Sequence, residues 1–172
     1  PWVRGSRRLG RRGNRPASSA PGARHSVPPT SVSARFKGRS TRASKEDVLS
    51  WMRWVHQGWF PGISIPRLEG VVDDVMDLFK GRFPCYRRCD TRYHDLEHTL
   101  RLIPPFCQIA GGLASEHQAI LSSTEVELGL VAVLLHDAGY IRRDDDRVGT
   151  GAKYTFRHID RSVAFARRYL PT

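Results

Sequence analysis

The chain has 172 residues, with 28 Lys and Arg against 17 Asp and Glu, and a formal net charge of +11 at pH 7. Eleven of the basic residues lie in residues 1–43, which leaves 17 to balance the 17 acidic residues, all of them in residues 44–172. Because this larger segment is formally neutral, the net charge does not indicate a basic nucleic-acid-binding fold. No stretch approaches the roughly 18 consecutive apolar residues of a transmembrane helix, and the length is typical of one domain.

Residues 1–43 are rich in Arg, Ser, Gly and Pro and have no periodic apolar face. Such a segment buries too little surface to offset the entropy of ordering, so we expect a disordered basic arm. A targeting leader, or sequence upstream of the true start, explains it more simply than an arm that contacts nucleic acid or anionic lipid. The three cysteines are expected to be free thiols of a cytoplasmic protein, or of an organellar one if the arm is a transit peptide.

Apolar residues at helical spacing predict an all-α domain over residues 44–172. Ser44 with Asp47 predicts the start of the first helix, and Thr124 is the expected N-cap of a later one. That later helix has no polar face in its second half, so we expect it to be buried on all sides. The predicted helices cover about residues 44–60, 66–81, 90–104, 124–138 and 157–170, the last with Ile159 and Val163 on its apolar face.

The dipeptide His136-Asp137 ends the most apolar of these segments. Burying an ionised carboxylate costs several kcal/mol unless a group of opposite charge lies beside it, and a divalent metal ion is such a group. A His-Asp pair satisfied by backbone groups or water near a helix end is the alternative that the dipeptide alone leaves open.

His94 and His98 are four residues apart, which on one helix places their Cβ atoms roughly 5–6 Å from each other. Two unrelated surface histidines would give the same spacing. His158 lies near the start of the last helix, so four histidines fall at helix ends that can converge at one end of a bundle. Imidazole and carboxylate donors favour Mn, Fe, Zn, Ni or Co over Mg or Ca.

Two segments, 93–100 with the sequence YHDLEHTL and 132–140 with AVLLHDAGY, resemble the signature helices of the HD-domain metal-dependent phosphohydrolases. The similarity extends over about residues 66–172 and is nearest to the branch that includes cyclic-nucleotide phosphodiesterases. The resemblance implies an α-helical bundle preceded by the basic arm. It also implies a phosphoester substrate, a nucleotide or cyclic nucleotide, and one or two divalent transition-metal ions.

The resemblance also implies a role for each residue. His98, His136 and Asp137 correspond to metal ligands, Asp137 thereby belongs to the catalytic centre, and His94 corresponds to the histidine that donates a proton to the leaving oxygen. His158 is similar to a histidine that some members use at a second metal ion. The family's final Asp ligand has no counterpart before Thr172, so we expect a C-terminally incomplete domain. A catalytically silent metal-binding or regulatory domain is the alternative function.

Other candidates have simpler explanations. Cys85 and Cys89 lack the companions of a zinc site, and we expect the acidic run 144–146 to be neutralised by its neighbouring arginines. The remaining histidines are expected to be solvated: His25, His56 and His117. Four basic residues near the motifs are candidates for holding a substrate phosphate: Arg92, Arg101, Arg142 and Lys153.

Overall fold

The structure, a computed structural model, describes residues 43–116 and 121–170. Over these residues the chain is all-α, as the sequence predicts. An isolated antiparallel β-bridge pairs Tyr86 with Arg143. Residues 1–42 of the predicted basic arm lie outside the described residues, as do His25 and His117. None of the described helices is long and apolar enough to cross a membrane.

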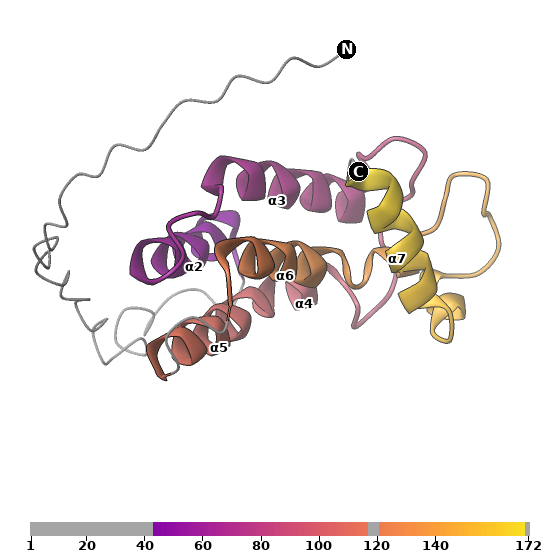
Figure 1. The fold of residues 1–172 in the computed structure, drawn as a ribbon. Coiled ribbons are helices and arrows are strands. Elements are labelled where there is room, and N and C mark those ends of the chain that lie inside the picture. Colours follow the sequence, from indigo (N-terminus) through magenta and orange to yellow (C-terminus); the bar gives the residue numbers. More distant parts are fainter. Residues whose placement is uncertain (1–42, 117–120, 171–172) are drawn as a thin grey trace, which may run out of the picture. The chain divides into compact units, whose positions relative to one another are not determined.

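Helices α2, α3, α5 and α6 form a bundle in which α2 packs against α3 and α5, and α6 packs against the same two helices (Figure 1). Helix α7 packs against the 3₁₀ turn η1 at the end of the bundle where α3 and α6 end. The elements are α2 (Lys45–Gly58), α3 (Ile65–Lys80), α4 (Leu96–Arg101), α5 (Ile103–Glu116), α6 (Ser123–Leu135), η1 (Ala138–Tyr140), η2 (Gly151–Tyr154) and α7 (His158–Tyr169).

The first two helices begin and end where the sequence predicts. The Ser44 side chain accepts a hydrogen bond from the Asp47 backbone, and the Asp47 carboxylate accepts one from the Ser44 backbone. This reciprocal pair satisfies two N–H groups that a helix start leaves free. Helix α3 stops at Gly81, whose φ of 73° is a left-handed conformation that glycine adopts without a steric penalty.

The third helix differs from its prediction. It begins at Leu96, not at Asp90 or Thr91, because the Asp95 carboxylate accepts a 2.8 Å hydrogen bond from the His98 N–H and caps the helix there. His94 therefore precedes the helix, and the expectation that His94 and His98 share one helical face is wrong. The chain turns at Leu102, and α5 follows with Pro104 and Pro105 in its first turn, where an N–H donor is not needed.

Helix α6 also differs in two respects. Ser122, not Thr124, is the N-cap, since its hydroxyl accepts from the Glu125 N–H while the Glu125 carboxylate accepts from the Ser122 backbone. The helix is not buried on all sides either. Leu128 is 51% exposed and Ala132 is exposed, because α3, α4 and α5 pack against other faces of α6.

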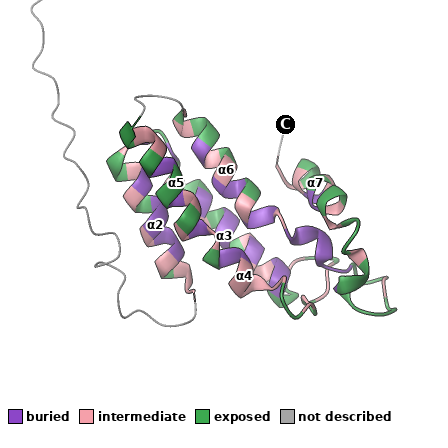
Figure 2. Ribbon diagram, turned by 90° about the horizontal axis from the view of Figure 1, so that it is seen from below, coloured by how far each residue is buried: buried purple, intermediate pink, exposed green. Residues whose placement is uncertain are grey.

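Helix α7 lies within its predicted range but turns a different face to the protein. Ser162 and Phe165 are buried, whereas Ile159 and Val163 are exposed. The reason is the close approach of α7 to η1, which brings Ser162 against the Gly139 backbone. Figure 2 shows that the buried residues line the inner sides of the bundle and continue into the turn after α6. The largest fully buried side chains include Met52, Leu68, Leu100, Ile103, Leu130 and Leu134.

Candidate metal centre

Two helix ends bring the sequence-predicted site residues together. His136 is the C-cap residue of α6 and Asp137 follows it, while His98 lies in the first turn of α4 and His94 lies just before that helix. Helices α4 and α6 are in contact. Segments that are far apart in the sequence, such as those of His94 and Asp137, therefore lie next to each other.

The Asp137 carboxylate is the centre of this cluster. Its Oδ2 lies 2.9 Å from His94 Nδ1, 3.1 Å from His136 Nε2 and 3.7 Å from His98 Nε2. Ligand atoms of His94, His98 and Asp137 lie within 4.8 Å of one another, a separation that one metal ion can span.

The environment of Asp137 favours a positive partner. Its side chain is 1% exposed, and the buried Oδ1 has no hydrogen-bond partner among the described residues. Burial raises the pKa of this carboxyl, but hydrogen bonds with His136 and His94 outweigh burial and hold the pKa below its ordinary value. A buried carboxylate that keeps its charge and has a free oxygen is the arrangement that a bound cation would complete.

His136 is held in the tautomer that a metal ligand needs. Its Nδ1 lies 2.8 Å from the backbone carbonyl oxygen of Val133, and a carbonyl only accepts hydrogen bonds, so Nδ1 carries a proton. Nε2 lies 3.1 Å from Asp137 Oδ2, to which it donates a hydrogen bond when it is protonated; in the neutral ring its lone pair would be available to a metal ion. The hydrogen bond with Asp137 raises the pKa of His136, a shift that burial partly opposes.

His94 is fixed by stacking as well as by hydrogen bonding. Its ring lies on the buried Tyr140 ring with centroids 4.3 Å apart and planes at 18°, and the His158 ring lies 4.5 Å from the same tyrosine at 19°. The His94 side chain is 34% exposed, so part of the ring faces solvent. Sequence reasoning missed Tyr140, although its place directly after the HDAG segment was a usable signal.

His158 lies close to the cluster but outside the group of ligand atoms. Its ring centroid is 6.0 Å from that of His94, and its Nδ1 donates to the Thr155 carbonyl oxygen at 2.7 Å. As in His136, this hydrogen bond leaves Nε2 as the nitrogen that can bind a further ligand. His158 thus lies next to His94, but it does not belong to the group of ligand atoms formed by His94, His98 and Asp137.

The donor set fits a transition-metal ion. Three imidazoles and one buried carboxylate converge. The His136 ring is oriented by its hydrogen bond to the Val133 carbonyl oxygen, and the His94 ring by its hydrogen bond to Asp137. Among the described residues, Asp137 supplies the one carboxylate of the group. The ligand atoms that one metal ion can bridge belong to His94, His98 and Asp137. The predicted ligand His136 lies outside this group, although its Nε2 is 3.1 Å from Asp137 Oδ2.

Three of the four basic candidates are already engaged. Arg142 is buried and donates to Asp90 at 2.6 Å, Lys153 pairs with Asp146, and Arg101 pairs with Glu97 at 2.7 Å. Arg92 is exposed and forms no ion pair with a described residue. Arg92 is therefore the one of the four that is free to meet an anionic substrate.

The cysteines form no metal site with the described histidines and acids. All three are free thiols, as predicted. Cys89 lies 3.3 Å from the His94 carbonyl oxygen, and burial raises its pKa; burial also raises the pKa of Cys107 to about 12. His56 is half-buried with its Nδ1 inaccessible and unpartnered, so the expectation that it is solvated is wrong.

Comparisons of the chain with protein-family models, with curated proteins and with solved structures found no match.

Proposed function

We propose that the chain is a metal-dependent phosphohydrolase with an HD-type centre, acting on a phosphoester such as a nucleotide or cyclic nucleotide. The observation that carries this proposal is the buried Asp137 carboxylate, with one unpartnered oxygen, at the centre of three histidines. A structural His-Asp pair would need only one histidine, and its carboxylate would have both oxygens satisfied.

In this proposal His98, His136 and Asp137 hold a divalent ion such as Mn, Fe, Zn, Ni or Co, and His158 is close enough to assist a second ion. A bound ion of this kind polarises a phosphoryl oxygen and lowers the pKa of bound water to about 7. The histidine side chains are 21–34% exposed, so a substrate phosphate can approach them from solvent. Arg92 lies two residues before His94 and is available for that phosphate.

His94 is the proposed proton donor to the leaving oxygen. Its Nδ1 is hydrogen-bonded to Asp137, which fixes the ring and directs Nε2 away from the carboxylate. Stacking on Tyr140 restricts the remaining rotation of the ring. A histidine oriented by a carboxylate in this way is suited to moving one proton at one atom.

The test uses the whole chain, stripped of metal and then reloaded separately with each of the five metals. We expect near-stoichiometric binding of at least one metal and hydrolysis of bis(p-nitrophenyl) phosphate by that form. Asp137→Asn should lose both properties, while Asp145→Asn, which removes an equal charge from an exposed site, should keep them. Equal metal content in wild type and Asp137→Asn would refute the metal centre.

The presence of a single carboxylate in the described ligand group favours a second candidate, a metal-binding domain without catalytic activity. The same experiment separates the two. Metal binding that depends on Asp137, with no turnover of diester, monoester or cyclic nucleotide, would support the silent domain. We also propose a cytoplasmic location, for which the three free cysteines are the supporting feature.

A further inference from the structure

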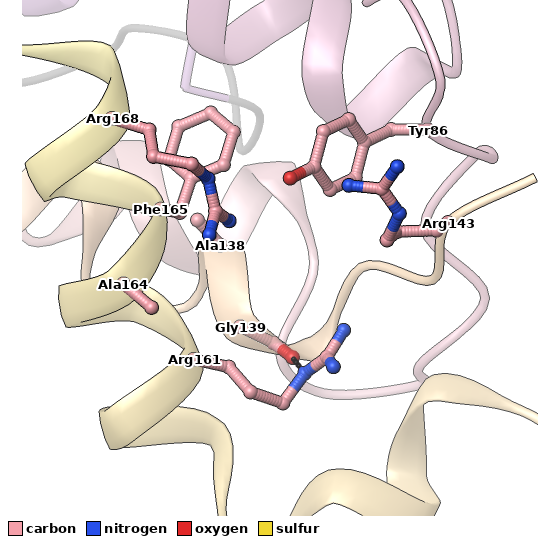
Figure 3. Close-up of a pocket in the computed structure, with 8 residues that line it drawn as sticks. All are labelled: Tyr86, Ala138, Gly139, Arg143, Arg161, Ala164, Phe165 and Arg168. Atoms are coloured by element: carbon pink, nitrogen blue, oxygen red, sulfur yellow. Dashed lines mark hydrogen bonds between the residues drawn. The ribbon is translucent and has the colours of Figure 1, made fainter.

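A cavity lies beside η1, and none of the residues of the candidate metal centre lines it. This cavity of about 220 Å³ opens between α7, η1 and the two segments joined by the Tyr86–Arg143 bridge. Phe165 and Ala138 supply apolar surface to it. Figure 3 shows side chains from all of these elements around the same space.

Three arginines and no acidic residue line this pocket: Arg143, Arg161 and Arg168. Arg161 is fixed in place, since its Nε donates to the Gly139 carbonyl at 2.6 Å and its Nη2 donates to the Ile141 carbonyl at 3.0 Å. Both acceptors are uncharged, so the positive charge of Arg161 is not neutralised by these hydrogen bonds.

The other two arginines have little neutralising charge. Arg168 is exposed and forms no ion pair with a described residue. Arg143 has Asp145 at 3.8 Å, but this aspartate side chain is 82% exposed, and an exposed pair at that distance contributes little. The pocket therefore has a net positive field that an anion would satisfy.

Tyr86 adds an uncharged donor. Its ring packs edge-on against Phe165 with centroids 5.5 Å apart, and the Arg143 guanidinium lies 5.8 Å from the ring centroid. These contacts hold the hydroxyl at the pocket, where it has no hydrogen-bond partner among the described residues. Figure 3 shows the hydroxyl on the side of the ring that faces the pocket interior.

We propose that this pocket binds a phosphate group, as inorganic phosphate or as the phosphate of a monoester. Its volume is below the roughly 300–1,000 Å³ of sites for drug-sized ligands, so a small anionic group fits better than a whole large ligand. Guanidinium groups match phosphate oxygens in charge and in planar, two-pronged geometry, and the tyrosine hydroxyl is a further donor to an oxygen. This proposal does not depend on the proposed hydrolase activity.

The experiment titrates inorganic phosphate into the metal-free whole chain by calorimetry, with sodium chloride keeping the ionic strength constant. Arg143→Ala and Arg168→Ala should each weaken phosphate binding about tenfold or more, since each removes a charge-assisted hydrogen bond. Arg167→Ala is the matched control, because it removes an equal charge from an exposed position of α7 outside the pocket. Circular dichroism checks that each variant keeps its helices.

Two further arms identify the ligand and the site. Tighter binding of phenyl phosphate than of inorganic phosphate would assign the pocket to a monoester whose organic group meets Tyr86 and Phe165, whereas equal binding would assign it to phosphate alone. His98→Ala should leave the affinity unchanged. Phosphate binding that survives in both arginine variants, that weakens equally in Arg167→Ala, or that disappears in His98→Ala would overturn the proposal.

Discussion

The hydroxyl of Ser162 donates a 2.6 Å hydrogen bond to the backbone carbonyl of His136 and accepts one of 2.9 Å from the Gly139 N–H. One buried side chain thereby ties α7 to both sides of the Asp137 backbone. Arg161 supplies two more hydrogen bonds from α7 to the same turn. The position of the candidate metal ligands consequently depends on α7, although α7 contributes no ligand to the central group.

Replacing Ser162 by alanine should destabilise the fold by about 1–3 kcal/mol, because the buried Gly139 N–H and the partly buried His136 carbonyl lose their partner. Metal affinity should also fall, since the support of His136 is lost. Urea unfolding and metal titration measure the two effects. Ser50→Ala is the control, because the Ser50 hydroxyl donates only to Glu46 in its own helix. Equal losses in the two variants would contradict the role of Ser162.

The proposed function predicts a specific phenotype for His94→Ala. In the metal-loaded chain, kcat for a phosphodiester should fall about 10²- to 10⁴-fold, the usual contribution of a positioned acid, while metal content stays unchanged. Added imidazole should restore part of the activity, because it can occupy the space of the missing ring and donate a proton. Loss of the metal in this variant would instead make His94 a ligand.

A third prediction concerns acid stability and rests on Asp90. Its Oδ2 accepts from Arg142 at 2.6 Å and its Oδ1 from the Gly151 N–H at 2.7 Å. Burial raises the pKa of Asp90, but these hydrogen bonds outweigh it and lower the pKa below its ordinary value. Because the folded pKa is below the unfolded one, Asp90 stabilises the fold above about pH 4, and this contribution is lost as the pH falls through the folded pKa.

Asp90→Asn should therefore lower the free energy of unfolding at pH 6 and make it less dependent on pH between about 5 and 3. Urea unfolding at several pH values measures the dependence. Asp145→Asn is the control, since this exposed carboxylate has one ion pair at 3.8 Å. If wild type and Asp90→Asn lose stability in parallel on acidification, the hydrogen bonds of Asp90 with Arg142 and Gly151 do not contribute to the pH dependence of stability.

The sequence predicts helix ends well where the signal is local. Ser44 with Asp47 encodes a reciprocal cap, and the cap is present. Ser122 with Glu125 encodes the same pattern, and this pair rather than Thr124 caps α6. Asp95 is a further N-cap signal, and recognising it would have placed His94 before the helix instead of on it.

Features that depend on tertiary contacts could not be predicted in the same way. The spacing of His94 and His98 did predict proximity, and their ring centroids lie 5.6 Å apart, but a capped turn and not a helical face produces it. The buried face of α7 follows from how closely its backbone approaches Gly139. Periodicity alone favoured Ile159 and Val163 for the buried face, because the spacing of apolar residues does not reveal how closely the α7 backbone packs against Gly139.

Gly139 itself provides the last prediction. A Cβ at this position would overlap the carbonyl oxygen of His158 and lie 2.8 Å from the backbone nitrogen of Ser162. Both are backbone atoms of α7, so neither can rotate away as a flexible side chain would. Gly139→Ala must therefore displace α7, which also breaks the hydrogen bond that Gly139 accepts from Arg161 and the one that it donates to Ser162.

We expect Gly139→Ala to destabilise the fold by about 1–3 kcal/mol or more, as overpacking does, and to weaken metal binding together with it. Gly112→Ala is a control for which we expect the opposite effect on stability. Gly112 lies within α5 with open space where its Cβ would be, so alanine there should stabilise the helix by roughly 0.5–1 kcal/mol. Urea unfolding of both variants measures the two changes in stability. An unchanged midpoint for Gly139→Ala would show that α7 tolerates displacement from η1, and the dependence of the metal ligands on α7 would then be wrong.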